Sequence, residues 1–148
     1  MKRMKKWMTY GLTLLFVLAM PILTYASARG VTRGQLISTA FITATDEGNG
    51  TVGVSAELYC HEGMRKIKIS LALQQWENNR WKTVDTQDFE WLAEDYPDED
   101  LFMALVSYEV PRQKRAANYR VRGDFYAYAK GSSASESKTA YTSDLFIE

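Results

Sequence analysis

The chain has little cysteine and histidine, with one of each in 148 residues. A single cysteine excludes an internal disulfide. If the chain is exported, its fold must therefore be stabilised by its core or by association with another chain. Adjacent residues of a strand point to opposite faces, so Cys60 and His61 are not expected to act as nucleophile and base or as half of a zinc site. Val54 and Leu58, at two-residue spacing from Cys60, favour a buried thiol.

The chain also lacks the common signatures of catalysis. It has no Gly-rich phosphate loop and no G-x-S-x-G serine motif. Eighteen acidic residues make some close carboxylate pair inevitable, so such a pair says little about glycoside hydrolysis. We therefore predict that the protein is not an enzyme and needs no cofactor. A small secreted hydrolase that uses a carboxylate pair is the alternative.

The N-terminal segment has the layout of a secretory signal peptide. Four basic residues (Lys2, Arg3, Lys5 and Lys6) precede an uncharged stretch, and "ASA" supplies the small residues of a cleavage site. We predict a helical signal peptide at 1–28, cleaved after Ala28 or alternatively after Ala26, and a secreted domain at 29–148. The alternative is an uncleaved membrane anchor, because residues 7–28 are uncharged and about 20 residues can span a bilayer.

The charge of the predicted mature chain argues against nucleic acid as a partner. Removal of the leader leaves 14 basic and 18 acidic residues (14 − 18 = −4). Binding to nucleic acid generally needs a basic surface that neutralises phosphates.

No long segment carries a helical period, and the mature chain consists of short alternating runs separated by turn residues. The expected strands are 35–47, 51–60, 66–76, 80–91, 101–110, 118–130 and 138–147. "HEGMR" at 61–65 reads as a loop, and "GNG" at 48–50 as a hairpin turn. About seven strands with regular turn signals predict an all-β fold, a single Ig-like antiparallel β-sandwich that follows the signal-peptide helix.

Two resemblances support this fold. "ANYRVRGDFYAYA" is similar to the penultimate strand of fibronectin-type and immunoglobulin-like domains, which implies that Tyr119 makes a corner hydrogen bond. The motifs "LALQQ", "WKTV" and "YRVRGDFYAYA" together resemble an uncharacterised family of small exported proteins from Gram-positive bacteria. That resemblance covers most of the mature chain and implies an architecture but no activity.

The acidic connection "EDYPDED" is the one candidate for a metal site. Asp95, Asp98 and Asp100 supply carboxylates of the kind that bind Ca²⁺, but the EF-hand spacing and its glycine are missing. A solvated acidic loop is the preferred interpretation, and we predict no metal.

The candidate contact residues lie on the outer face of the strand pair 66–76 and 118–130. Alternation places Ile67, Ile69, Leu71, Leu73, Tyr119, Val121 and Phe125 in the core. It places aromatic and basic side chains outside, where Trp76 is expected to lie near Arg120 and Arg122. Tyr, Trp and Arg are enriched where proteins hold partners, although aromatic pairs also stabilise sheets without a ligand. The predicted contact set is Trp76, Trp81, Arg120, Arg122, Tyr126 and Tyr128.

The tryptophan hairpin "QQWENNRW" sharpens this prediction. With Asn78 and Asn79 as the turn, Trp76 opposes Trp81 on the outer face. Strict register then sets Ile69 against Asp88, which is poor for a core, so we expect a bulge near Lys82 or Thr83 that could turn Trp81 inward.

These features predict a secreted, non-catalytic module that contacts an extracellular protein or a cell-surface glycan. A secreted effector that acts through oligomerisation is a further alternative. Contact with a membrane is expected only through an uncleaved leader.

Overall fold

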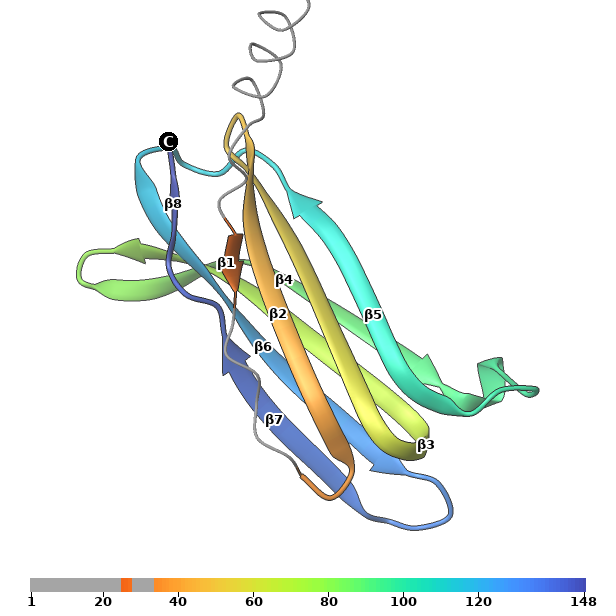
Figure 1. Cartoon of the computed structure of the whole chain (residues 1–148). Coiled ribbons are helices and arrows are strands. Elements are labelled where there is room, and N and C mark those ends of the chain that lie inside the picture. The colour runs from red at the N-terminus through yellow and green to blue at the C-terminus, as the bar shows by residue number, and fades with distance from the viewer. Residues whose placement is uncertain (1–24, 28–33) are drawn as a thin grey trace, which may run out of the picture.

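A computed structural model describes residues 25–27 and 34–148 (Figure 1). Residues 1–24 of the predicted signal-peptide helix and the cleavage site after Ala28 lie outside the described residues, whereas residues 25–27 form a strand and not the predicted helix. Within the described part of the chain, no helix is long and apolar enough to cross a membrane.

The described chain is all-β and antiparallel, as predicted. Its strands are β1 (Tyr25–Ser27), β2 (Ile37–Gly48), β3 (Thr51–Glu77), β4 (Arg80–Leu92), β5 (Leu101–Val110), β6 (Ala117–Ala129), β7 (Ser135–Tyr141) and β8 (Leu145–Ile147), with one short 3-10 helix, η1 (Ala93–Asp95). The expected strands fall within β2 to β8, but 51–60 and 66–76 form the single strand β3, and 138–147 divides into β7 and β8. Strand β1 falls inside the predicted leader and pairs with Thr43–Thr45 of β2, so cleavage after Ala28 would remove it.

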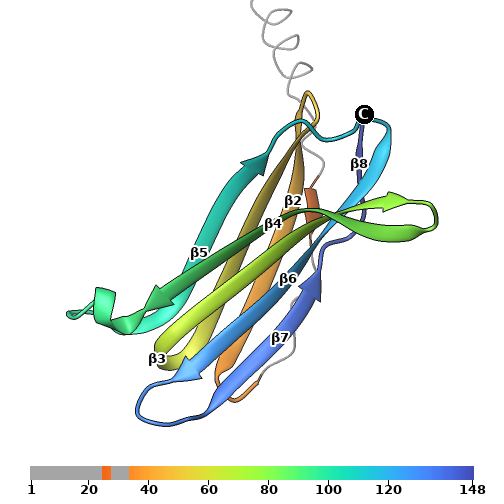
Figure 2. The same ribbon diagram turned by 180° about the vertical axis from the view of Figure 1, so that it is seen from behind.

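Strand β3 organises the sheet because it changes neighbours along its length. Its first half, 51–60, lies between β2 and β5, whereas its second half, 66–77, lies between β4 and β6. Figure 1 shows β3 bending back on itself between these halves, and Figure 2 shows β4, the second half of β3, β6 and β7 side by side. We call β1, β2, β5 and the first half of β3 the first arm, and the remaining strands with the second half of β3 the second arm.

The prediction of a loop at 61–65 was therefore wrong, because the segment belongs to β3 and its central residue Met64 pairs with neighbouring strands. Met64 is fully buried and pairs with both Leu101 of β5 and Ala129 of β6. Register shifts lie on either side of Met64, where the strand bends and changes neighbours. Turn-forming residues here produce a bend within a strand rather than an interruption of it.

The core forms where the apolar faces of the two arms meet. The seven residues assigned to the core from the alternation of β3 and β6 are all fully buried: Ile67, Ile69, Leu71, Leu73, Tyr119, Val121 and Phe125. The first arm contributes Ala40, Ile42, Val52, Val54, Ala56 and Leu58. A side chain at Gly123 of β6 would come within 2.4 Å of the Ile42 Cδ1 atom of β2, which shows how closely the arms approach.

The two hairpin turns form as their sequences predict. Asn78 and Asn79 both have positive φ, 53° and 59°, as a type I′ turn requires. At the earlier turn, Gly48, Asn49 and Gly50 have φ of 86°, 54° and 73°. Asparagine and glycine adopt this left-handed region at low cost, which explains their presence at both turns.

The β3–β4 hairpin contains the expected bulge, one residue beyond the predicted position. Gln74 pairs with Thr83 and Leu73 with Asp85, so Val84 is the extra residue. The shift sets Phe89, rather than Asp88, opposite Ile69. Because the bulge follows Thr83, it leaves Trp81 paired with Trp76 and does not turn Trp81 inward.

Candidate functional site

The candidate site is the outer face of the second arm. Strand pairing sets Gln74, Ala72 and Lys68 of β3 opposite Arg120, Arg122 and Tyr126 of β6, respectively. All six predicted contact residues therefore lie on this one face, spread along the length of the β3–β6 pair. They form two groups, one beside the β3–β4 hairpin and the other toward the opposite end of β6.

The two tryptophans of the hairpin pack against each other. Their ring centroids are 5.2 Å apart with an interplanar angle of 62°, an edge-to-face arrangement. Trp76 is the more exposed ring, at 43 %, whereas Trp81 is half-buried. Trp81 thus supports the pair, and Trp76 offers its surface to solvent.

Arg120 extends this pair into a longer row of planar groups. Its guanidinium carbon lies 4.4 Å from the centroid of Trp81 and 4.6 Å from that of Tyr141 on β7. We call Trp81, Arg120 and Tyr141 the Trp–Arg–Tyr stack. The sequence predicted that Trp76 would lie near Arg120, but Trp81 is the indole on which the guanidinium stacks. A cation between two aromatic rings is attracted by both ring faces.

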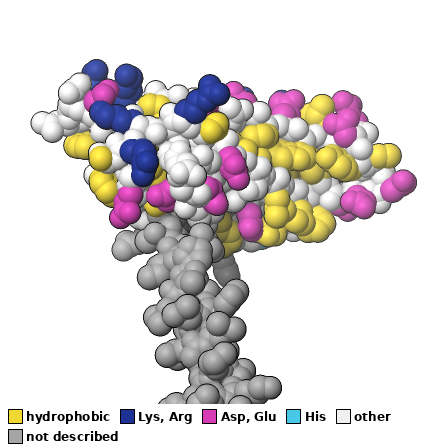
Figure 3. Space-filling model, turned by 90° about the horizontal axis from the view of Figure 1, so that it is seen from above, with side chains coloured by type: hydrophobic (Ala, Val, Ile, Leu, Met, Phe, Trp, Pro, Cys, Tyr) yellow, Lys and Arg dark blue, Asp and Glu magenta, His cyan; other side chains and the backbone are white. Residues whose placement is uncertain are grey.

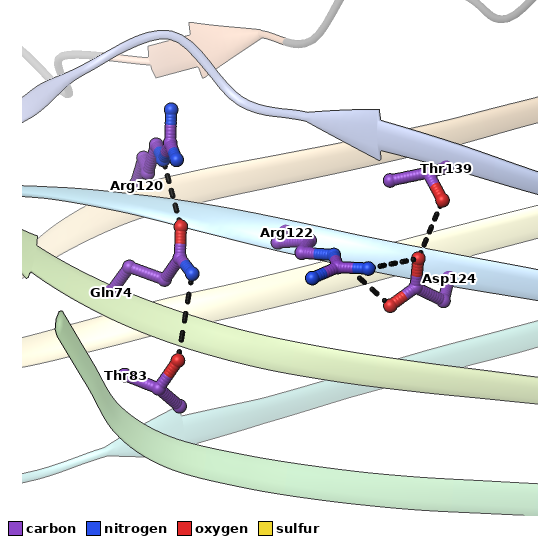
Figure 4. A network of polar contacts seen from close by, with 6 residues as sticks. All are labelled: Gln74, Thr83, Arg120, Arg122, Asp124 and Thr139. Atoms are coloured by element: carbon purple, nitrogen blue, oxygen red, sulfur yellow. Dashed lines mark hydrogen bonds and ion pairs between the residues drawn. The ribbon is translucent and has the colours of Figure 1, made fainter. Parts of the chain in front are cut away.

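Hydrogen bonds hold this arginine in place (Figure 4). Arg120 Nε donates to Gln74 Oε1 at 2.8 Å, and Gln74 Nε2 donates to Thr83 Oγ1 at 3.5 Å. Gln74 thereby connects β6 to β4 across β3. Within the described residues Arg120 makes no other side-chain hydrogen bond, so its terminal amino groups can donate to a ligand.

Arg122 belongs to a separate group. It forms an ion pair with Asp124 on the same strand (Nε to Oδ2, 3.1 Å), and Thr139 Oγ1 donates to Asp124 Oδ1 at 2.6 Å (Figure 4). The hydrogen bond and the charge of Asp124 raise the pKa of Arg122. Its guanidinium is already paired, which makes it a weaker candidate for contact than Arg120.

Tyr126 and Tyr128 occupy the other end of the face. Tyr128 lies under two basic side chains, with Arg65 Cζ at 5.2 Å and Lys66 Nζ at 5.5 Å from its ring centroid. Both tyrosines are half-buried. The structure therefore does not bring them together with the tryptophans into a single cluster.

Sequence reasoning missed two aromatic residues of this face, Tyr141 and Phe146. Residues 138–147 were expected to form one strand, but a break after Tyr141 separates β7 from β8. At the break, Thr142 Oγ1 accepts a hydrogen bond from Val121 N at 2.9 Å. Tyr141 then pairs with Arg122, and Phe146 pairs with Asn118.

These two rings are well exposed, at 43 % for Tyr141 and 54 % for Phe146. Alternation along β6 puts Asn118 on the same face as Arg120, so Phe146 faces the same side. In the sequence, Tyr141 and Phe146 stand directly before and after "TSDL", and this pair of aromatic residues was the one signal that could have indicated them. Only the break in the strand places both on the outer face.

The acidic connection between β4 and β5 lines a hollow of about 410 Å³. Within the described residues, no three His, Cys, Asp or Glu side chains lie close enough to hold a metal ion. The structure thus does not bring Asp95, Asp98 and Asp100 together. Asp100 instead pairs with Lys130 at 3.3 Å.

Cys60 is buried, as the spacing of its apolar neighbours indicated, whereas His61 is exposed. Burial and, to a lesser extent, the charge of Glu136 raise the pKa of the Cys60 thiol to about 11. The thiol therefore stays protonated at neutral pH, which makes it a poor nucleophile. His61 Nε2 lies 3.2 Å from the carbonyl oxygen of Gly34.

Glu136 of β7 ties the start of the domain to the second arm. Its Oε2 accepts hydrogen bonds from Leu36 N (2.6 Å) and Ile37 N (3.0 Å), and its Oε1 pairs with Lys138 Nζ at 3.1 Å. Partial burial raises the pKa of Glu136, but these contacts outweigh burial and leave its pKa below the ordinary value of 4.5. The carboxylate also fills the space that a side chain at Gly34 would take.

The lowered pKa of Glu136 predicts acid sensitivity. Its stabilising contribution is full above an ordinary pKa of 4.5 and is lost as the pH falls through the lower pKa of the folded state. We expect Glu136→Gln to cost about 1 kcal/mol of unfolding free energy at neutral pH. Below pH 4.5 the difference from wild type should shrink.

Urea unfolding over a pH series measures this effect. Glu62→Gln, at an exposed position in the bend of β3, is the matched control and should leave the profile unchanged. If the unfolding free energies of the wild type and of Glu136→Gln depended equally on pH, the Glu136 carboxylate would contribute nothing to the acid sensitivity.

The chain matches no protein-family model and no curated protein sequence. Its function must therefore be argued from the face just described.

Proposed function

We propose that this protein is a secreted, non-catalytic module with an Ig-like β-sandwich fold. It contacts an extracellular protein or a cell-surface glycan through the outer face of the second arm. Two observations support the fold. The arms approach closely where Ile42 meets Gly123, and Tyr119 Oη donates to the carbonyl oxygen of Lys114 at 2.8 Å. A tyrosine near the start of a strand that bonds back to the backbone a few residues upstream is a hallmark of such sandwiches.

The Trp–Arg–Tyr stack, with Trp76 beside it, is the observation that carries the proposal. Its side chains are held before any ligand arrives, by ring stacking and by the hydrogen bond from Arg120 to Gln74. Ordering a mobile side chain at an interface costs about 0.5–1.5 kcal/mol, and a fixed side chain avoids this cost. Exposed rings then pack on a partner while the free amino groups of Arg120 donate to its oxygen atoms.

Either a sugar or a protein loop fits these groups. A pyranose ring packs flat on an indole, and its hydroxyls accept from a guanidinium. A protein partner would use the same rings as anchors, as tryptophan, tyrosine and arginine do in many interfaces. The alternative of a membrane-anchored protein differs only in whether the leader stays attached.

Binding of the purified protein to bacterial cell-wall and host-cell surfaces tests the proposal. We expect Trp76→Ala to weaken binding at least tenfold, because an anchor ring at the centre of an interface contributes about 2 kcal/mol or more. Arg120→Lys should weaken it similarly, since lysine keeps the charge but loses the planar group that stacks. Periodate treatment of the surface would abolish binding to a glycan, and protease treatment would abolish binding to a protein.

Phe41→Ala is the matched control, because Phe41 is exposed to the same extent as Trp76, 43 %, but lies on β2 in the first arm. Wild-type binding to neither surface, or equal binding by Trp76→Ala and the wild type, would contradict the proposal.

A further inference from the structure

Strand β5 has an open edge. It pairs with β3 on one side and, within the described residues, with no strand on the other. The unpaired N–H and C=O groups of such an edge can hydrogen bond with a strand of another chain. Proteins usually prevent this with charged residues, bulges, short strands or a covering segment.

The other edges of the described sheet carry such protection. Strand β4 has charged side chains at Arg80, Lys82, Asp85, Asp88 and Glu90 and a bulge at Val84. Strand β7 has Glu136 and Lys138 among its seven residues, and β8 has only three residues. Strand β1 covers part of β2.

Strand β5 differs from all of these. Its sequence, "LFMALVSYEV", contains no lysine, arginine, proline or glycine, and its one charged residue is Glu109. Apolar side chains near its start face solvent, with Phe102 and Leu105 each 50 % exposed and Met103 37 % exposed. Figure 3 shows a band of hydrophobic side chains that leads to the end of the molecule where η1 lies. Among the residues that the structure describes, nothing protects this long, apolar edge.

The charges that flank β5 indicate what covers it. The preceding segment contains Glu94, Asp95, Asp98 and Glu99, besides Asp100, which pairs with Lys130, and the following segment contains Arg112, Lys114 and Arg115. These flanks lie at opposite ends of β5 (Figure 1), and ten strand residues at about 3.3 Å each separate them by roughly 30 Å. Salt screens charges beyond about 10 Å, so within one chain the two flanks cannot neutralise each other.

An antiparallel second copy would account for both the open edge of β5 and the opposite charges of its two flanks. We propose that β5 pairs with β5 of a second copy about a two-fold axis near the middle of the strand. Antiparallel pairing sets the acidic flank of each copy beside the basic flank of the other, twice in the dimer. It also satisfies the open edge and covers apolar side chains beside it. A parallel pairing would instead set acid beside acid and base beside base.

This dimer does not involve the outer face of the second arm. The Trp–Arg–Tyr stack belongs to β4, β6 and β7, whereas the pairing strand belongs to the first arm. The proposal therefore stands apart from the proposed function, and either can fail without the other.

Sedimentation equilibrium of the protein purified after expression of the full chain tests the pairing. We expect a concentration-dependent dimer that weakens as salt is raised. Leu105→Lys, which puts a charge at the centre of the paired edge, should weaken the dimer at least tenfold. The matched control is Ser137→Lys, an exposed position on the outer face of β7, and it should leave the dimer intact.

Charge reversal tests the antiparallel direction. An acid-to-base variant (Asp98→Lys with Glu99→Lys) and a base-to-acid variant (Arg112→Glu with Lys114→Glu) should each dimerise about tenfold more weakly, because like charges then face each other. Mixed in equal amounts, the two variants should form a heterodimer of near wild-type affinity. One chain carrying all four substitutions should form a homodimer again. Circular dichroism checks that each variant is folded.

A monomer at every concentration would overturn the proposal. So would a dimer that survives Leu105→Lys, which would place the interface elsewhere, including the N-terminal segment. Failure of the two reversed variants to associate when mixed would overturn the antiparallel arrangement.

Discussion

Replacing Gly123 with alanine is expected to lower the free energy of unfolding by about 2 kcal/mol, in urea denaturation followed by tryptophan fluorescence. The new Cβ would lie 2.4 Å from Ile42 Cδ1, 3.0 Å from Phe125 Cε2 and 3.1 Å from Leu71 Cδ2. In a close-packed core these neighbours cannot all move away without strain. Gly123 does not have positive φ, so alanine would otherwise stabilise the strand by restricting the unfolded chain. The expected loss of unfolding free energy therefore comes from packing alone.

A second substitution separates packing from other causes. Ile42→Val removes the Cδ1 atom that the new methyl group would strike, and by itself it should cost about 1 kcal/mol. In this background Gly123→Ala should cost well under 1 kcal/mol, giving a large coupling energy between the two sites. Additive effects would mean that β2 and β6 do not pack face to face at this point.

Replacing Tyr119 with phenylalanine is expected to cost about 1.5 kcal/mol of unfolding free energy. Tyr119 is fully buried, and its hydroxyl donates to the Lys114 carbonyl at 2.8 Å. Burial is the main cause that raises the pKa of Tyr119, and the hydrogen bond to Lys114 opposes it. Without the hydroxyl, the turn between β5 and β6 loses its tie to the core, and the carbonyl loses its partner.

Tyr126→Phe supplies the control for this measurement. Tyr126 is on the same strand but faces outward and is half-buried. Its substitution should change stability by less than about 0.5 kcal/mol. Equal effects at the two tyrosines would show that the hydrogen bond from Tyr119 adds nothing specific.

The parts of the fold that depend on neighbouring residues could be predicted from the sequence. Alternation assigned Ile67, Leu71 and Phe125 to the core, because side chains of a strand point to opposite faces at a period of two. The asparagine turn set Trp76 against Trp81, since few residues adopt positive φ at low cost. The poor match of Ile69 with Asp88 even indicated a bulge, although the structure sets it at Val84.

The errors concern features that depend on distant parts of the chain. Residues 61–65 have the composition of a loop, yet pairing of Met64 with β5 and β6 keeps them in β3. The last strand divides because Thr142 bonds to Val121, 21 residues away. Neither contact has a local signal.

The candidate face illustrates the same division. By itself the sequence determined that the protein would be all-β, which faces of β3 and β6 would be buried, and that Trp76 would be exposed. These properties follow from alternation and turn chemistry over a few residues. Only the tertiary structure decided that Arg120 stacks on Trp81 and Tyr141, and that the described strands leave one edge of β5 open. Both depend on which strands become lateral neighbours, and that choice is made by packing of the whole core.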